Sequence, residues 1–229
     1  SVAACDRRSE RTTEKTPTEN APAAPTAETK APTSPELRSG TMGPDDPRGA
    51  AVNVEVRDAL KAADDDMKKV LMELETLGAK SISALSVEDA RKQPGPADAV
   101  QSLLKKEGKK VAPIEVAKTE DRKIPGPGGQ IATRIYTPKT DDKRPLPVIV
   151  YFHGGGFVIG TIDSYDASAR ALAKGANAIV VSADYRHAPE AKFPSAHDDA
   201  FAAYEWTLKN AGTFGGDPKR VAVAGESAG

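Results

Sequence analysis

The chain has 229 residues, enough for one large domain or for a domain with a tail. Its formal net charge of -1 argues against nucleic acid and against an anionic membrane surface as an electrostatic partner. Its single cysteine excludes an internal disulfide framework and a multi-cysteine metal site, and no segment approaches the roughly 20 apolar residues of a membrane-spanning helix.

Residues 1–50 are expected to form a disordered tether. They contain no Phe, Trp, Tyr or Ile and are rich in Pro, Thr, Ala and Glu, so they cannot bury enough apolar area to offset the entropy of ordering. Within this segment, Val2-Ala3-Ala4-Cys5 is similar to a bacterial lipobox, whose cysteine carries lipid. Lipid on Cys5 would anchor the protein to a membrane and place it in the bacterial cell envelope. An unmodified cysteine in a cytoplasmic protein is the alternative.

Residues 51–108 are expected to be helical. Apolar residues recur at spacings of mostly three and four along residues 56–77, and Gly78 suits the position just after the end of a helix. Ser86 precedes acidic residues in a pattern typical of a helix N-cap, and a further short helix is expected over residues 97–106. The charged faces of these helices suit exposure to solvent. The pattern therefore indicates a packed helical layer and by itself implies no catalytic chemistry.

From residue 109 the pattern changes to alternating strands and helices. Strands are expected at 111–117, 130–137, 147–152, 178–182 and 220–224, and helices at 167–174 and 197–209. The turn residues at 125–129 join the first two of these strands. This alternation predicts an α/β fold, in which a parallel sheet is covered by helices on both faces.

Two glycine motifs follow buried strands and carry the chemistry. Gly-Glu-Ser-Ala-Gly at 225–229 is typical of a strand-to-helix elbow, which holds the nucleophile Ser227 in a strained φ,ψ region. His-Gly-Gly-Gly-Phe at 153–157 can point backbone N–H groups at a ligand, and acyl transfer needs such donors for its oxyanion. Either motif alone could be a flexible turn or a coincidence, but both in this order predict a nucleophile beside an oxyanion hole.

These two motifs and Asp-Tyr-Arg-His-Ala-Pro-Glu at 184–190 resemble one known family. They are similar to the hormone-sensitive lipase family of α/β-hydrolases, the group of the bacterial family IV esterases, over about residues 52–229. Glu226 stands where that family usually has Asp or Thr. A Glu at this position of the motif is also seen in the carboxylesterase–cholinesterase group. The motif at 184–190 and the leading His153 favour the lipase-related family.

The resemblance implies an α/β-hydrolase fold, with residues 109–229 as the N-terminal part of the catalytic domain. It implies that residues 51–108 form a helical cap over the acyl pocket and that Ser227 is the nucleophile. The expected oxyanion hole consists of Gly154, Gly155, Gly156 and Ala228. His153 is expected to support this loop through hydrogen bonds, and no metal or cofactor is implied.

The resemblance also implies that the catalytic acid and then the catalytic histidine follow the serine in the sequence. His153, His187 and His197 all precede it, so none is expected to act as the base, and this chain is expected to be an inactive, C-terminally truncated part of the enzyme. The activity implied for the full protein is hydrolysis of a carboxylic ester through an acyl-enzyme. The alternatives are an amidase or deacetylase of the same fold, and a hydrolase-like binding module without catalysis.

Overall fold

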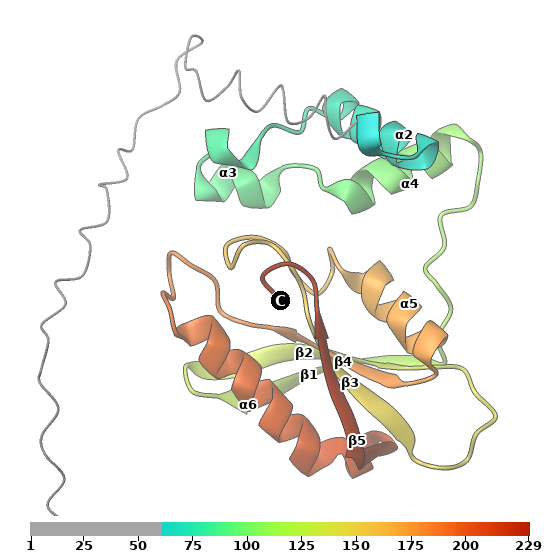
Figure 1. The fold of residues 1–229 in the computed structure, drawn as a ribbon, viewed down its shortest axis with the longest axis vertical. Helices are drawn as coiled ribbons and strands as arrows, with labels where there is room; N and C mark the ends of the chain where they lie inside the picture. The colour runs from blue at the N-terminus through green and yellow to red at the C-terminus, as the bar shows by residue number, and fades with distance from the viewer. Residues whose placement is uncertain (1–60) are drawn as a thin grey trace, which may run out of the picture. The chain divides into compact units, whose positions relative to one another are not determined.

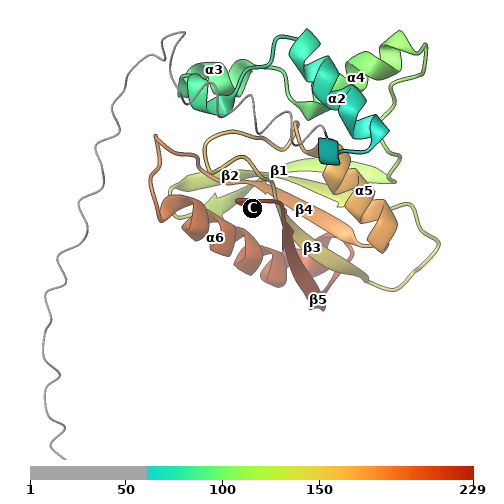
Figure 2. The same cartoon turned by 45° about the horizontal axis from the view of Figure 1, so that its top comes forward.

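The computed structural model describes residues 61–229 (Figures 1 and 2). These residues all belong to one compact unit of the chain. The expected tether and Cys5 lie outside the described residues, so both stay predictions. Along residues 61–229, no helix combines the length and the apolar character needed to cross a membrane.

Three α-helices come first: α2 (Asp65–Thr76), α3 (Val87–Lys92) and α4 (Pro96–Lys106), with a 3-10 turn at Ile82–Ala84. The prediction of one continuous helix over 56–77 is wrong for the residues that the structure describes, because the chain leaves the helical conformation at Ala63 and Asp64. The side chain of Asp64 accepts a hydrogen bond from the amide of Met67 at 2.8 Å, and this N-cap starts a new helix.

The other predicted helix boundaries in this region are confirmed. Gly78 has a φ of 82° directly after the C-cap of α2, and Ser86 Oγ accepts a hydrogen bond from an amide of α3 at 3.1 Å. Helices α2 and α4 are joined by the buried carboxylate of Glu73, which accepts hydrogen bonds from Ser102 Oγ and Lys106 Nζ, each at 2.6 Å. The assignment of residues 51–108 as a cap stays a prediction.

A five-stranded sheet follows, in the order β1-β2-β4-β3-β5. Its strands are β1 (Lys118–Gly126), β2 (Gly129–Thr137), β3 (Leu146–Phe152), β4 (Ile179–Asp184) and β5 (Gly216–Gly225). The expected parallel pairing is confirmed for β4, β3 and β5, but β2 runs antiparallel to both of its neighbours. The tight turn between Gly126 and Gly129 explains the pairing of β2 with β1, because a turn that short can join only antiparallel strands.

The strand expected over 111–117 is not formed. The chain there has no regular secondary structure, and strand β1 begins at Lys118. Pro113 has no amide hydrogen to donate to a ladder, whereas every residue from Lys118 to the turn has a partner in β2. The predicted turn residues, and not the apolar run before them, therefore locate the hairpin.

Helices α5 (Asp166–Ala176) and α6 (Ser195–Asn210) cover opposite faces of the sheet (Figure 1). Because successive side chains of a strand alternate, Val150 of β3 packs in the core beside α6 and Tyr151 in the core beside α5. The buried Ala169 and Ala173 let α5 approach the strands closely. The prediction of a sheet covered on both faces is confirmed.

Strand β5 lies at one edge of the sheet and, within residues 61–229, pairs only with β3. Most of its side chains are exposed, and Val223 is 58% exposed. Its parallel register sets Gly225 opposite Phe152 of β3. The segments that follow these two strands therefore emerge side by side at the carboxyl edge of the sheet, and they are the two glycine motifs.

Candidate active site

Ser227 occupies a tight turn directly after β5. Its φ of 54° lies in the left-handed region that non-glycine residues rarely adopt, as expected for a nucleophile elbow. A Cβ atom added to Gly225 would lie 2.3 Å from the carbonyl carbon of Gly229, and one added to Gly229 would lie 2.1 Å from the oxygen of Phe152. Both motif glycines are therefore required by backbone contacts, which explains their spacing around the serine.

The glycine loop packs directly against this elbow. A Cβ atom added to Gly154 would lie 2.9 Å from the carbonyl oxygen of Glu226 and 3.5 Å from the Cβ of Ser227. The amide of Glu226 also donates to the oxygen of Phe152 at 3.3 Å. The fold thus brings the predicted nucleophile and the predicted oxyanion loop into contact.

The conformation of the loop leaves amide groups available. Gly155 and Gly156 have φ of 126° and 60°, and the carbonyl of Gly155 accepts hydrogen bonds from two following amides at 3.0 Å. Within residues 61–229, the N–H groups of Gly155, Gly156 and Ala228 donate to no backbone carbonyl. Amides without a backbone partner in the loop and next to the serine are what an oxyanion hole requires, although the assignment of these residues stays a prediction.

His153 lies beneath the loop and is fully buried. Its Nδ1 is 2.8 Å from the oxygen of Gly154, and its ring stacks on Tyr185 with centroids 4.6 Å apart. The hydroxyl of Tyr185 donates to the carbonyl of His153 at 2.6 Å. These contacts fit the supporting role expected for His153 and explain how the Asp-Tyr-Arg segment serves the loop.

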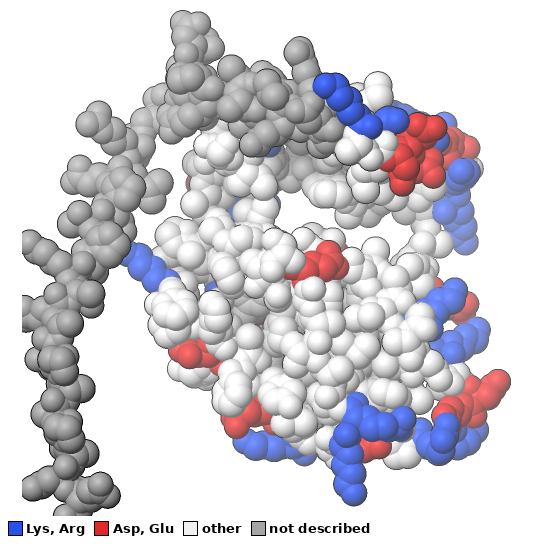
Figure 3. Space-filling view, viewed as in Figure 1, with Lys and Arg blue, Asp and Glu red and all other residues white. Residues whose placement is uncertain are grey.

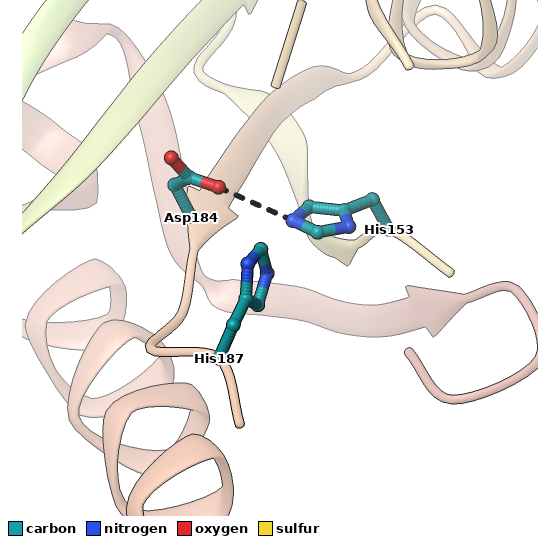
Figure 4. Close-up of side chains that lie close together, drawn as sticks. All are labelled: His153, Asp184 and His187. Carbon is teal, nitrogen blue, oxygen red and sulfur yellow. Dashed lines mark hydrogen bonds and ion pairs between the residues drawn. The ribbon is translucent and has the colours of Figure 1, made fainter. Parts of the chain in front are cut away.

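Two further polar side chains lie beside His153 (Figure 4). Asp184, at the end of β4, has Oδ1 3.3 Å from His153 Nε2, and the ring of His187 stands edge-on to that of His153 at 5.5 Å. Burial, with a smaller effect of His153, lowers the pKa of His187. Only the fold brings these residues together, because they come from three separate segments of the chain and no sequence pattern links them.

Tyr151 of β3 holds the residue before the nucleophile. Its hydroxyl donates to Oε1 of Glu226 at 2.5 Å, and burial, followed by this hydrogen bond, raises the pKa of Tyr151, so the hydroxyl stays protonated as a donor. The sequence analysis missed this contact. A tyrosine on a buried strand was the available signal, because a buried Tyr hydroxyl needs a polar partner.

Arg91 of α3 connects the helical segment to the catalytic loops, and the sequence analysis missed it too. Its Nε donates to the carbonyl of Val158 at 2.8 Å, just after the glycine loop. Its Nη atoms donate to the carbonyl of Ala188 at 2.9 Å and to both carboxylate oxygens of Glu190 at 2.8 Å. The hydrogen bonds from Arg91 are the main reason that the pKa of Glu190 is lowered to about 2.

The contacts of the three histidines are made with residues other than Ser227, the predicted nucleophile. His153 is engaged beneath the loop, and His197 is exposed on the first turn of α6, where it stacks on Phe157. Within residues 61–229, Ser227 has no hydrogen bond to a histidine or a carboxylate. Asp199 is likewise structural, because its buried carboxylate pairs with Arg186 at 2.8 Å.

The parallel strands of this mixed sheet lead into a serine elbow and a glycine loop at their carboxyl edge, an arrangement typical of an α/β-hydrolase. Residues 149–229 match the family model described as an alpha/beta hydrolase fold. The α/β-hydrolase fold expected for this chain and its resemblance to the lipase-related esterases are confirmed.

Among the relatives, Esterase LipI of Mycobacterium tuberculosis is 53% identical over 110 residues, which are 48% of this chain and 34% of that protein. Carboxylesterase NlhH of the same organism is 54% identical over 99 residues, which are 43% of this chain and 31% of that protein. The chain therefore aligns with about a third of the length of these curated relatives.

Solved structures agree with this assignment. An esterase of Pyrobaculum calidifontis is 38% identical, with a TM-score of 0.56, and the match covers 69% of this chain and 48% of that one. The thermostable carboxylesterase EstE1, cloned from a metagenomic library, is 41% identical, with a TM-score of 0.55 and coverage of 66% and 48%.

Proposed function

We propose that this chain carries the nucleophile of a serine carboxylic ester hydrolase that acts on small esters through an acyl-enzyme. The observation that carries the proposal is Ser227 on a left-handed elbow, packed against a glycine loop with available amides. The names of the similar proteins, esterase and carboxylesterase, support an ester as the substrate.

The proposed reaction has two steps. The oxygen of Ser227 attacks the ester carbonyl carbon, its proton passes to a base and then to the leaving alcohol, and an acyl-serine forms. Water then attacks the acyl carbon, and the carboxylic acid and free serine are released. In both steps the negative carbonyl oxygen accepts hydrogen bonds from the amides of Ala228, Gly155 and Gly156, with Gly154 as a further candidate.

The base and the acid of the triad are proposed to come from outside residues 61–229 and to follow Ser227 in the sequence. The support is the lack of a histidine or carboxylate bonded to Ser227 among the described residues. The edge position of β5 and the exposure of Val223 also support it, because an apolar edge strand is a surface suited to pairing with a further strand.

The charge distribution supports an uncharged substrate. On the face of the molecule in Figure 3, the middle carries few charged side chains, and Lys and Arg gather mainly along the rim. Such a face offers no concentration of positive charge for an anionic substrate, in line with a neutral ester.

Substrate profiling of the complete gene product tests this function. We expect turnover of p-nitrophenyl acetate and butyrate, and little turnover of the matching p-nitroanilides. A phosphonate ester should form a covalent adduct on Ser227, located by mass spectrometry of the peptide. The chain of residues 1–229 alone should show no turnover, because it lacks the proposed base.

The outcomes separate the alternatives. Faster hydrolysis of the anilides than of the esters would favour the amidase, and N-acetylated substrates test a deacetylase. Absence of both turnover and adduct in the complete protein would favour a hydrolase-like binding module. Ester turnover by residues 1–229 that depends on Ser227 would contradict the proposed source of the base.

We also propose that Cys5 carries lipid and anchors the enzyme at the bacterial cell envelope. The support is the small-residue run before Cys5 and the polar segment after it. Mass spectrometry of the N-terminal peptide from the native host tests it. A free Cys5 thiol on a protein in the soluble fraction would support the cytoplasmic alternative.

A further inference from the structure

We propose that His153, Asp184 and His187 form a binding site for one divalent transition-metal ion of the zinc class. The three residues offer two imidazole nitrogens and a carboxylate oxygen, all within 4.8 Å of one another. In Figure 4 the three side chains converge from separate segments of the chain. This site is distinct in chemistry from ester hydrolysis and does not depend on it.

The hydrogen bonds of His153 leave a place for a cation. Its Nδ1 lies 2.8 Å from the carbonyl oxygen of Gly154, and a carbonyl can only accept, so the proton sits on Nδ1. The Nε2 atom of a neutral ring then presents a lone pair to Asp184 Oδ1 at 3.3 Å. Two acceptors that face each other need a positive species between them. A backbone carbonyl on the far nitrogen is also the usual outer partner of a metal-bound histidine.

His187 supplies the third donor. Its Nε2 atom is buried and has no hydrogen-bond partner within residues 61–229, although buried polar atoms are nearly always satisfied. A ligand that accepts its lone pair would remove this deficit. The unpartnered nitrogen belongs to a residue of the cluster, so it is a second observation beside the short distances among the three residues.

The spacing fits tetrahedral coordination. With bonds of about 2.0–2.1 Å, two ligand atoms of a tetrahedral zinc ion lie about 3.4 Å apart. The separation of 3.3 Å between His153 and Asp184 already meets this value. The donor of His187 lies within 4.8 Å of the other two ligand atoms, which exceeds the tetrahedral spacing by at most about 1.4 Å. A small side-chain movement would close this difference, and water would take the fourth position.

The chemistry and access of the site select the ion. Imidazole nitrogens with a carboxylate suit Zn²⁺, Co²⁺, Ni²⁺ or Cu²⁺, whereas Mg²⁺ and Ca²⁺ prefer oxygen ligands alone. Asp184 also lines a cavity of about 430 Å³ between the β1–β2 hairpin and residues Thr161–Asp163. An ion can thus enter from the Asp184 side, although His153 itself is fully buried.

Metal titration of the full chain tests the proposal. The Cys5→Ser background removes the only thiol as a competing ligand. We expect one equivalent of Co²⁺ to bind with the visible absorption of a tetrahedral complex, Zn²⁺ to displace it, and Mg²⁺ to have no effect. His187→Leu and Asp184→Asn should each weaken binding at least about 10-fold. His197→Gln, at the one histidine outside the cluster, is the matched control and should bind normally.

A measurement without a variant in the cluster keeps the test independent of folding. On addition of Zn²⁺, the ring ¹⁵N resonances of His153 and His187 should shift and those of His197 should not. The proposal is overturned if no equivalent binds, or if both cluster variants bind as tightly as the parent. It is also overturned if His153 carries protons on both nitrogens and keeps them in Zn²⁺, since a proton would then fill the gap to Asp184.

Discussion

The two halves of the candidate active site are supported very differently. The glycine loop rests on the buried His153, which stacks on Tyr185, and Arg91 fixes the chain just beyond it. The serine elbow follows the exposed edge strand β5, and its polar side-chain anchor is the hydrogen bond from Tyr151 to Glu226. The proposed oxyanion donors are therefore preorganised by the core, whereas the proposed nucleophile follows a strand that has one unpaired edge within residues 61–229.

This contrast predicts at which positions a substitution should disturb the candidate active site. Around the loop, loss of one contact leaves others in place, so only changes in its backbone should misplace the donors. Around the elbow, close backbone contacts at Gly225 and Gly229 leave little room for any side chain at these two positions. Few side chains, however, help to hold the elbow in place. Substitutions in the complete protein can separate the effect of backbone sterics from that of side-chain support.

The largest expected effect belongs to Ser227→Ala. It removes the hydroxyl of the proposed nucleophile, only one oxygen atom on an exposed turn, so turnover of p-nitrophenyl esters should fall at least about 10⁴-fold while the fold persists. Initial-rate assays and circular dichroism measure the two effects. Ser83→Ala, at an exposed serine in the helical segment, should change neither. Near-normal turnover in Ser227→Ala would mean that the elbow is only a binding turn.

The next effect tests the loop backbone. Gly155→Ala should lower kcat about 100- to 1000-fold with a smaller change in KM, because a Cβ there would lie 1.9 Å from the oxygen of Ile159 at a φ of 126°. Gly175→Ala is the matched control, since its Cβ meets nothing within 4 Å in α5. If Gly155→Ala keeps its kcat, the donors do not come from this loop.

A smaller effect is expected at the elbow's polar anchor. Tyr151→Phe removes one hydrogen bond to a carboxylate, a contact type worth about 1.5–3 kcal/mol, and should lower kcat about 10-fold by loosening Glu226. Tyr204→Phe, at a tyrosine of α6, serves as the control. An unchanged kcat together with a lower thermal midpoint would show that Tyr151 stabilises the fold without positioning Ser227.

Much of this fold could be predicted because local signals agreed with the tertiary structure. The apolar strands at 147–152 and 178–182 lie inside the sheet, and the caps at Gly78 and Ser86 form as expected. The apolar residues at 111–117 misled the prediction, because a strand is defined by its partner and Pro113 interrupts the required amides.

The contacts that support the candidate site could not be predicted in the same way. Arg91 is one of many charged residues on a helical pattern, and its partners Val158 and Glu190 are 67 and 99 positions away. Likewise, only the parallel pairing of β3 with β4 sets Asp184 beside His153. Glycine motifs carry their geometry in the sequence, whereas side-chain partners depend on the register of the whole sheet.

The smallest effect concerns this Arg91 contact. Arg91→Ala should raise KM for medium-chain esters a few-fold with little change in kcat, because it frees the helical segment and leaves the glycine loop supported by His153.

The low pKa of Glu190 predicts a pH dependence of the stability that Arg91 contributes. A carboxylate whose pKa is depressed on folding stabilises the folded state above its unfolded pKa of about 4.3, and this contribution is lost as the pH falls toward 2. The difference in thermal midpoint between wild type and Arg91→Ala should therefore narrow from pH 6 to pH 3. Lys92→Ala, whose partner Glu88 lies on the same helix, controls for lost surface charge. If kcat falls with KM unchanged, the arginine positions the oxyanion loop itself, and the loop is less self-sufficient than its buried supports indicate.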